Sequence, residues 1–261
     1  MTIGDKLAIA GRDRTDAEVL IAHALKRDRS WIIAHAGDVL DDNTDLMIDS
    51  MMERRRRGEP VAYITGSKEF FGRSFIVKPS VLIPRPATEL LVEQALEALD
   101  GEKIEKIREI DTDIVAWSEI KQSVSDVKHI IDIGTGSGCI AVTLACERPD
   151  LHIIATDISE DALAVARANA ERHQVSDRII FRCESACESL ETIDEPFLIV
   201  SNPPYIPEGT ILEREVRDFE PATALFAGAD GTDVLIRIVG LARKQPQCSG
   251  FVMECMTSQV S

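Results

Sequence analysis

The chain has 261 residues, of which 44% are hydrophobic and 28% charged, a composition usual for a globular protein and unlike a disordered one. Its 29 lysines and arginines against 45 aspartates and glutamates give a net charge of −16. Proteins that wrap duplex nucleic acid rely on cations that neutralise phosphates, so this charge argues against that class of function. No apolar run approaches the ~18 residues that cross a bilayer, and roughly 150 residues per domain predicts two domains.

The N-terminal sequence and the cysteines indicate the cellular compartment. Residues 1–14 contain no apolar stretch before a small-residue cleavage site, so no signal peptide is expected. The six cysteines form no C-x-x-C pair and have no histidine at metal-ligand spacing, which argues against a zinc site, and no metal is expected. Free thiols in a reducing compartment are the expected state, and the chain is predicted to be cytoplasmic.

The first part of the chain is predicted to be helical. Residues 15–57 carry apolar side chains at spacings of three and four, the pattern of amphipathic helices. Four consecutive arginines at 54–57 end at Gly58, with Pro60 just beyond, which is typical of a helix end. This basic run is either a solvated helix end favoured by the helix dipole or a contact for an acidic partner.

The middle of the chain changes in composition twice. Between residues 66 and 86, phenylalanine, isoleucine and valine are interrupted by Gly72 and three prolines, which predicts a β-hairpin that links two domains. Residues 88–99 return to a helical pattern. Residues 100–127 are rich in lysine and glutamate and poorly periodic, so we expect a surface insertion, partly helical at best, with no chemistry of its own.

From residue 129 onward, strands alternate with helices. Short, nearly continuous apolar runs predict strands covered on both faces at 129–133, 151–156, 179–182, 197–201 and 251–254. Helices are expected at 138–148, 159–173 and 232–243. This alternation predicts an α/β fold with a doubly wound, mainly parallel sheet, preceded by a small helical domain and the hairpin.

A glycine-rich segment follows the first of these strands and opens a helix. Gly134, Gly136 and Gly138 allow tight turns and close approach to a ligand, and the helix start presents unpaired N–H groups. Their G-x-G-x-G spacing differs from the G-x-G-x-x-G of pyrophosphate-binding turns, so a dinucleotide is the weaker interpretation. Asp157 ends the next strand, where a carboxylate can accept both ribose hydroxyls. The pair predicts a nucleoside-containing cofactor; a structural turn with a helix-capping aspartate is the alternative.

The tetrad Asn202-Pro203-Pro204-Tyr205 follows the fourth strand, so we expect it to face the same crevice as the glycine-rich loop. Asn202 offers a side-chain carbonyl and Pro203 a backbone carbonyl, and two rigid acceptors can bind both hydrogens of an –NH₂ group. Tyr205 offers a flat face to a planar group. The arrangement suits an amide or the exocyclic amine of a base, and it needs no strong base because the nitrogen lone pair is directed at the electrophile. A proline-rich strand exit is the alternative, and it leaves Asn202 unexplained.

Together these motifs resemble those of class I S-adenosylmethionine-dependent methyltransferases that act on planar amines. The flanking segments resemble the peptide chain release factor N5-glutamine methyltransferase family; they are Gly58-Glu-Pro-Val-Ala-Tyr-Ile-Thr-Gly66, Val81-Leu-Ile-Pro-Arg-Pro-Ala-Thr-Glu89 and Glu220-Pro-Ala-Thr-Ala-Leu225. The resemblance covers nearly the whole chain except residues 100–127. It implies a helical substrate-docking domain over 1–66, a hairpin linker over 67–90 and a class I methyltransferase domain over 91–261.

The resemblance also implies a reaction and the residues that perform it. The substrate would be the glutamine of the release factor's Gly-Gly-Gln loop, methylated on its side-chain amide nitrogen (N5), with S-adenosylmethionine as cofactor. Cofactor contacts would come from Gly134, Thr135, Gly136, Ser137, Gly138, Asp157 and Asn202. Asn202 and Pro203 would be catalytic and grip the amide, and Pro204 and Tyr205 would complete the substrate pocket. A monomer that binds release factors, but neither membranes nor duplex nucleic acid, is expected.

The sequence departs from the family's pattern in two places. After the third strand the family usually carries an aspartate and a bulky residue at the adenine, whereas this chain has Ser185 and Ala186 as the expected cofactor contacts, beside Glu184. A lost charge-assisted hydrogen bond costs about 1.5–3 kcal/mol. The family normally adds a helix and an antiparallel strand pair after the fifth strand, where this chain stops at Ser261. We therefore expect missing C-terminal strands, a bare strand edge and marginal stability.

Three questions stay open at the level of sequence. The first is whether Arg85 and Glu89 line the entrance to the site or form salt bridges between the domains. An adenine-N6 DNA methyltransferase shares the tetrad and would flip its base out of the duplex, although the charge of −16 disfavours it. A truncated, catalytically silent release-factor-binding protein is the third possibility, and it would not bind cofactor.

Overall fold

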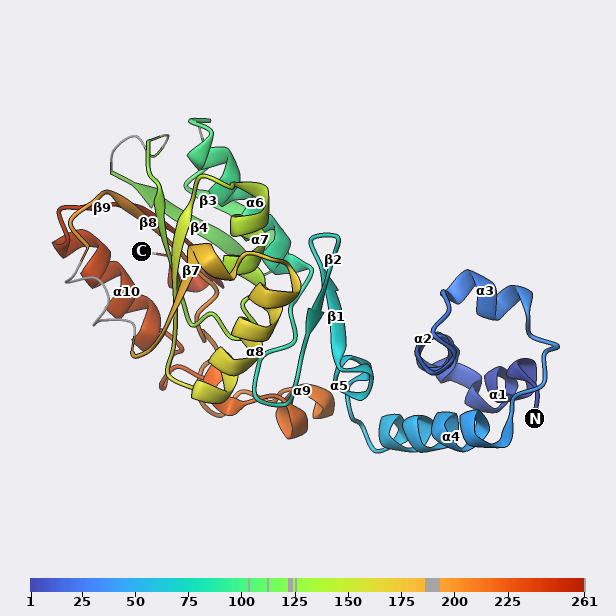
Figure 1. The fold of residues 1–261 in the computed structure, drawn as a ribbon. Helices are drawn as coiled ribbons and strands as arrows, with labels where there is room; N and C mark the ends of the chain where they lie inside the picture. Colours follow the sequence, from blue (N-terminus) through green and yellow to red (C-terminus); the bar gives the residue numbers. More distant parts are fainter. Residues whose placement is uncertain (103, 112, 122–123, 125, 186–192, 261) are drawn as a thin grey trace. The chain divides into compact units, whose positions relative to one another are not determined.

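The computed structural model describes residues 1–102, 104–111, 113–121, 124, 126–185 and 193–260, and the chain divides into two compact units (Figure 1). The first unit holds residues 1–67 and 213–219, and the second holds residues 68–212 and 220–261. The segment 213–219 thus groups with the first unit, although the sequence assigns it to the domain at 91–261. None of the described helices is long and apolar enough to cross a membrane.

The first unit is helical, as the sequence predicts. Its helices are α1 (Ile3–Ala10), α2 (Arg14–Leu25), α3 (Arg29–Ala34), α4 (Asp42–Arg56), α5 (Val61–Thr65) and α9 (Arg214–Phe219). Helix α2 packs against α1, α3, α4 and α5, and its buried Leu20 and Ile21 share a core with Ile48 of α4. The sequence does not predict α1, which begins in a capping box where Thr2 and Asp5 each accept the other's backbone N–H.

The arginine run at 54–57 ends helix α4 and pairs with carboxylates of its own unit. Arg55 lies between Asp16 of α2 and Glu215 of α9, at 2.6 and 2.5 Å. The other three arginines pair with glutamates of α4 and of the turn after it. The contact of Arg55 with Glu215 is one physical reason why 213–219 belongs to the first unit.

The second unit contains a seven-stranded sheet in the order β3-β4-β9-β8-β5-β6-β7. Its strands are β3 (Ile107–Asp111), β4 (Ile114–Ile120), β5 (His129–Ile133), β6 (His152–Asp157), β7 (Ile179–Cys183), β8 (Phe197–Ser201) and β9 (Cys248–Met256). From β9 to β7 all neighbours are parallel, whereas β4 is antiparallel to both β9 and β3. The prediction of a doubly wound, mainly parallel sheet is confirmed.

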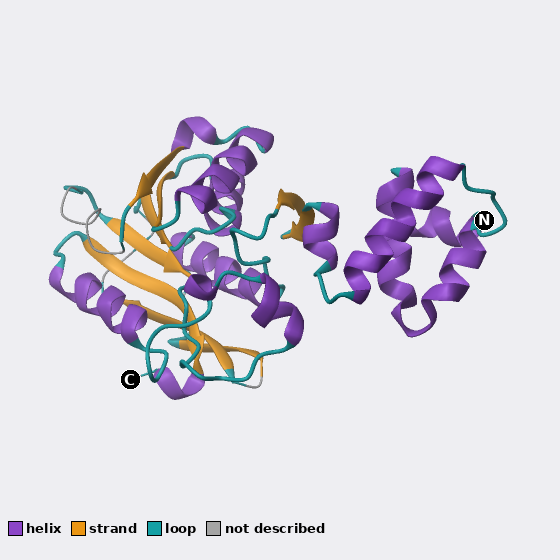
Figure 2. Ribbon diagram, turned by 90° about the horizontal axis from the view of Figure 1, so that it is seen from below, coloured by secondary structure: helices purple, strands orange, loops and turns teal. Residues whose placement is uncertain are grey.

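Helices cover both faces of this sheet (Figure 2). One face packs against α6 (Ala87–Leu99), α7 (Cys139–Glu147) and α8 (Glu160–Arg172), and the other packs against α10 (Asp233–Lys244). Strand β9 serves both cores, because Val252 faces the first and its neighbours Phe251 and Met253 face the second. Burial on both faces explains why these strands have apolar runs without alternation.

The hairpin predicted between the domains is present as the two-stranded sheet of β1 (Ser67–Phe70) and β2 (Arg73–Ile76). Asn169 of α8 is fully buried and fastens β2: its Oδ1 accepts from the Ile76 N–H at 2.7 Å, and its Nδ2 donates to the Ile76 carbonyl at 2.9 Å. The same Nδ2 donates to the Ser137 carbonyl at 2.8 Å. One buried amide therefore joins the hairpin to the glycine-rich loop.

The prediction for residues 100–127 was wrong. This segment supplies β3 and β4, and β4 pairs with β9 along its length, from Ile114 opposite Met256 to Ile120 opposite Gly250. Trp117 is buried and packs edge-on against Phe251, with 5.0 Å between ring centroids. The four residues 115–118 are all buried, but the apolar run covers only residues 114–117 and lies in a segment rich in lysine and glutamate, which hid the strand.

The prediction of a bare strand edge was wrong for the same reason. Strand β4 occupies the outer edge of β9, and the antiparallel pair that the resemblance implies after the fifth strand has its counterpart in β3 and β4, which precede β5 in the chain. The sheet now ends at β3, a short strand that carries Arg108 and Glu109, and short charged strands resist edge-to-edge pairing. The expectation of marginal stability stays a prediction, which a measured free energy of unfolding would test.

Candidate active site

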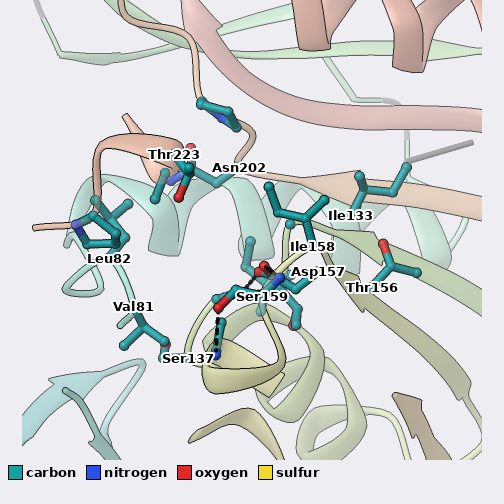
Figure 3. Close-up of a pocket in the computed structure, with 18 of the residues that line it drawn as sticks. Val81, Leu82, Ile133, Ser137, Thr156, Asp157, Ile158, Ser159, Asn202 and Thr223 are labelled. Atoms are coloured by element: carbon teal, nitrogen blue, oxygen red, sulfur yellow. Dashed lines mark hydrogen bonds between the residues drawn. The ribbon is translucent and has the colours of Figure 1, made fainter. Parts of the chain in front are cut away.

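A cavity of about 360 Å³ opens at the carboxyl ends of β5, β6 and β8, where open α/β sheets bind their ligands (Figure 3). Its walls come from the loops after these strands, from the loop 80–85, and from the first turns of α6 and α10. Of the predicted site residues, those that line it are Gly134, Thr135, Gly136, Ser137, Asp157, Ser185, Asn202 and Pro204. The glycine-rich loop and the tetrad therefore share one cavity.

The glycine-rich loop is fastened to the end of β6 through its backbone. The N–H groups of Gly134 and Thr135 both donate to the Thr156 carbonyl at 2.9 Å, and the Gly136 N–H donates to Asp157 Oδ2 at 2.9 Å. Gly134 has φ +71°, and no described atom lies within 4 Å of the position a Cβ would take there. At Gly134 the loop thus presents bare backbone to a ligand.

Gly138 has a different role from its two neighbours. Its φ is +79°, and a Cβ there would lie 3.0 Å from the Cβ and 3.2 Å from the Cα of Ala166 on α8. The glycine is required for the close approach of the start of α7 to α8. Gly138 does not line the cavity, so its part in cofactor binding rests on the resemblance alone.

Asp157 ends β6 with its carboxylate held by two backbone amides. Its Oδ2 accepts from Gly136 and its Oδ1 accepts from the Ser159 N–H, each at 2.9 Å. Burial raises the pKa of Asp157, and the hydrogen bonds from Ser159 and Gly136 oppose that rise. Each oxygen keeps a lone pair, so the fixed carboxylate can still accept hydrogen bonds from ligand hydroxyls (Figure 3).

Asp132, at the end of β5, is fully buried beneath the loop. Its Oδ2 accepts from Thr135 Oγ1 at 2.7 Å and from the Ala141 N–H at 3.1 Å. Burial raises the pKa of Asp132 to about 7, although these two hydrogen bonds lower it. Within the described part of the chain, Asp132 Oδ1 and the hydroxyl of Thr156 have no hydrogen-bond partner, which points to a polar ligand or water beside the loop.

The cavity continues at the end of β7, where Glu184 and Ser185 line it. The Glu184 N–H donates to the Asp157 backbone carbonyl at 3.0 Å, which ties this loop to the end of β6. Ala186, the second predicted contact here, lies outside the described residues. A serine in the position expected for an aspartate is thus placed at the cavity wall.

The tetrad contributes only two of its four residues to the cavity wall. Asn202 is half-buried and lines the cavity (Figure 3). Pro204 lines it too, whereas Pro203 is buried between them. Tyr205 does not line it: its hydroxyl donates to Glu254 Oε1 at 2.9 Å, and its backbone carbonyl accepts from Gln259 Nε2 at 2.8 Å. The tyrosine therefore anchors the tetrad, and its ring is not placed on the cavity wall.

The sequence did not identify two residues that hold the tetrad: Thr88, which itself lines the cavity, and Glu254, which does not. Thr88, at the start of α6, donates its hydroxyl to Glu254 Oε2 at 2.8 Å and accepts from Asn202 Nδ2 at 3.0 Å. Glu254 is only 1% exposed. Burial raises the pKa of Glu254, while the hydrogen bonds from Thr88, Tyr205 and Asn202 lower it. A glutamate inside an otherwise apolar strand was the signal that could have identified it.

Arg85 and Glu89 have separate roles. Arg85 lines the cavity and pairs at 2.5 Å with Glu220, whose side chain is buried and also accepts from the Ile83 N–H at 3.2 Å. Arg85 therefore lines the cavity, as one interpretation predicts, whereas its salt bridge joins two residues of the second unit and not two domains. Glu89 accepts from the Phe71 N–H at 2.9 Å and fastens the hairpin, outside the cavity wall.

Among the further lining residues, Val81, Leu82 and Thr223 lie in segments that carry the family resemblance, although the sequence gives them no role in the site. Ile158, Phe226 and Arg237 carried no signal in the sequence. Where side chains are described, no cluster of three potential metal ligands occurs, and the five cysteines described there are free thiols.

Comparison with known proteins assigns the chain to a family. Residues 4–66 match the model of the PrmC N-terminal domain, and residues 116–221 match that of the methyltransferase small domain. The release factor glutamine methyltransferase of Nitratidesulfovibrio vulgaris is 40% identical over 92% of this chain and 74% of its own length. This chain belongs to the release factor glutamine methyltransferase family. The resemblance inferred from the motifs is confirmed.

Other relatives agree with this assignment. The family member of Koribacter versatilis is 39% identical over 92% of this chain and 78% of its own length. A bifunctional methyltransferase of Rickettsia conorii is 35% identical over 91% of this chain and 46% of its own length. Among solved structures, the hMettl16 catalytic domain in complex with MAT2A 3'UTR hairpin 1 has a TM-score of 0.50 at 16% identity, and covers 82% of this chain and 67% of that one. The hMettl16 catalytic domain and this chain therefore share the same fold.

Proposed function

We propose that this protein transfers a methyl group from S-adenosylmethionine to the side-chain amide nitrogen of the glutamine in the Gly-Gly-Gln loop of peptide chain release factors. One observation carries the proposal: Asn202 lies in the same cavity as Asp157 and the glycine-rich loop. Membership of the release factor glutamine methyltransferase family supports the choice of substrate.

The residues of the cavity suit S-adenosylmethionine. A volume of about 360 Å³ lies within the range of roughly 300–1,000 Å³ common for small-ligand sites. The open space at Gly134 admits a ligand against the backbone, and the carboxylate of Asp157 on the cavity wall suits ribose hydroxyls. When bound, S-adenosylmethionine supplies an electrophilic methyl group.

The tetrad prepares the substrate nitrogen for attack. The carboxamide oxygen of Asn202 and the backbone carbonyl of Pro203 accept the two N–H groups of the glutamine amide. An amide nitrogen has its lone pair delocalised, and holding both hydrogens directs that lone pair toward the methyl group. Oriented in this way, the nitrogen needs no strong general base, and positioning supplies a large part of the rate.

The two units have separate tasks in this proposal. The helical unit docks the release factor, and the second unit performs the transfer. The charge of −16 disfavours the alternative DNA substrate, because binding to a phosphate backbone depends on cations.

Radiolabelled S-adenosylmethionine tests the proposal with three acceptors: a release factor, the same factor with the loop glutamine replaced by alanine, and duplex DNA. We expect label in the first acceptor only. Label in DNA and none in the release factor would contradict the proposed substrate. Equal labelling of the alanine-substituted factor would place the methyl group on another residue.

A further inference from the structure

Glu254 is a buried side chain beside the active site, where Thr88, Tyr205 and Asn202 hydrogen-bond to its carboxyl group. It lies on β9 opposite Ala116 of β4, is 1% exposed, and does not line the cavity. Its Oε2 accepts from Thr88 at 2.8 Å and its Oε1 from Tyr205 at 2.9 Å. A buried charge is costly unless it is hydrogen-bonded, so this carboxylate holds its two donors firmly in place.

Thr88 passes this constraint on to Asn202. Its hydroxyl carries a single proton, and it donates that proton to Glu254 Oε2 at 2.8 Å. Toward Asn202, at 3.0 Å, the Thr88 oxygen is therefore left as an acceptor. The part of the Asn202 amide that faces Thr88 must be the donor, Nδ2, since the carboxamide oxygen has no proton to offer.

This fixes which end of the Asn202 amide is free for a ligand. With Nδ2 engaged by Thr88, the Oδ1 atom remains available on the cavity side. In the reversed orientation an –NH₂ group would meet the –NH₂ group of a substrate amide, and two donors cannot pair. Without Thr88 and Glu254 the two orientations of Asn202 would differ little in free energy.

We propose that Thr88 and Glu254 are positioning residues that lock the Asn202 amide with its oxygen toward the substrate, and so make the site selective for an –NH₂ donor. The inference rests on the proposed function and adds two residues to it. Tyr205, the second donor to Glu254, holds the other end of the tetrad against the same carboxylate. Through these hydrogen bonds Glu254, which lies outside the cavity, determines that Asn202 presents its oxygen inside the cavity.

Paired substitutions at Thr88 test this proposal. Thr88→Val keeps the shape and removes the hydroxyl, and Thr88→Ser keeps the hydroxyl. Against intact release factor, we expect Thr88→Val to lower kcat by about 10- to 100-fold, while the Kd for S-adenosylmethionine changes less than about threefold. We expect Thr88→Ser to stay within about threefold of the wild-type kcat.

Thr143→Val is the matched control, because Thr143 is a fully buried threonine of α7 outside the cavity. The kcat of this variant should equal that of the wild type.

The side-chain amide resonance of Asn202 supplies a readout that altered packing alone would not move. In ¹⁵N spectra we expect its Nδ2 protons to be shifted and less protected from exchange in Thr88→Val, and unchanged in Thr88→Ser. A Thr88→Val protein with wild-type kcat overturns the proposal. So does a fall in kcat with an unchanged Asn202 resonance, because Thr88 would then not act through Asn202. A wild-type protein that does not methylate release factor at all contradicts the proposed function itself.

Discussion

The two sides of the cavity are held in different ways. The glycine-loop side, residues 134–138 with Asp157, is held by backbone groups of adjacent loops. The tetrad side, residues 202–205 with Thr88 and Glu254, is held by side chains from distant elements. On the first side, Gly136 and Ser159 donate backbone N–H groups to one carboxylate. On the second side, α6, the loop after β8 and strand β9 meet at Glu254. The difference implies that binding of cofactor and orientation of substrate are separable, so a substitution on one side should leave the other largely intact.

The largest effect is expected on the tetrad side, from Asn202→Ala. Loss of the carboxamide removes an acceptor for the substrate amide, and we expect kcat for release factor to fall by about 1,000-fold, comparable to the loss of a positioned donor in other enzymes. Calorimetry should give a Kd for S-adenosylmethionine within about threefold of the wild type. Turnover near the wild-type rate would show that Asn202 does not grip the amide.

Trp117→Ala tests whether β4 is an integral part of the sheet that carries Glu254. Trp117 is 3% exposed and packs against Phe251, so its truncation should lower the free energy of unfolding of the second unit by about 3–5 kcal/mol. Chemical denaturation followed by circular dichroism measures this loss. Glu109→Ala on exposed β3 is the control, with an expected change below about 0.5 kcal/mol. Similar small losses for both variants would mean that β4 is dispensable.

Asp157→Asn tests the glycine-loop side. The substitution removes the charge and places an –NH₂ group against one of two backbone donors, so we expect the affinity for S-adenosylmethionine to fall by about 10- to 100-fold, or about 1.5–3 kcal/mol. At saturating cofactor, kcat should change less than about threefold. A large fall in kcat with unchanged affinity would mean that the two sides are not separable.

The smallest effect is expected from the pH dependence of Asp132. Its pKa is raised by burial to about 7, so between pH 4 and pH 7 the folded protein keeps a proton that the unfolded chain has lost, and its stability falls as pH rises. Without cofactor, between pH 6 and pH 7, the wild type should lose about 1 kcal/mol relative to Asp132→Asn. Unfolding free energies at the two pH values measure this difference. Parallel pH profiles of the two proteins would mean that Asp132 is ionised throughout.

The same contrast explains how far the sequence predicted the site. On the glycine-loop side, the glycines follow one strand and Asp157 ends the next, so strand order alone predicts that they meet. On the tetrad side, the tetrad itself is recognisable, but its partners are not. Thr88 lies 114 positions from Asn202 and 166 from Glu254, and nothing local to any of the three indicates the pairing.

The fold shows a related limit. Strands β5 to β8 were predicted to within one residue because each is a short apolar run between helical segments. Strand β4 was missed because its apolar run is only four residues long within a charged segment, and its pairing with β9 is made only in the tertiary structure. The assignment of 213–219 to the first unit likewise depends on Arg55 meeting Glu215, far apart in the sequence.

The measurement that tests the central claim most directly is a fragmentation mass spectrum of the Gly-Gly-Gln peptide, released by protease from a release factor incubated with this protein and S-adenosylmethionine. The account predicts one added methyl group, located on the side-chain nitrogen of the loop glutamine and absent when the Asn202→Ala variant is used. An unmodified glutamine, or a methyl group on any other residue of the factor, would contradict it.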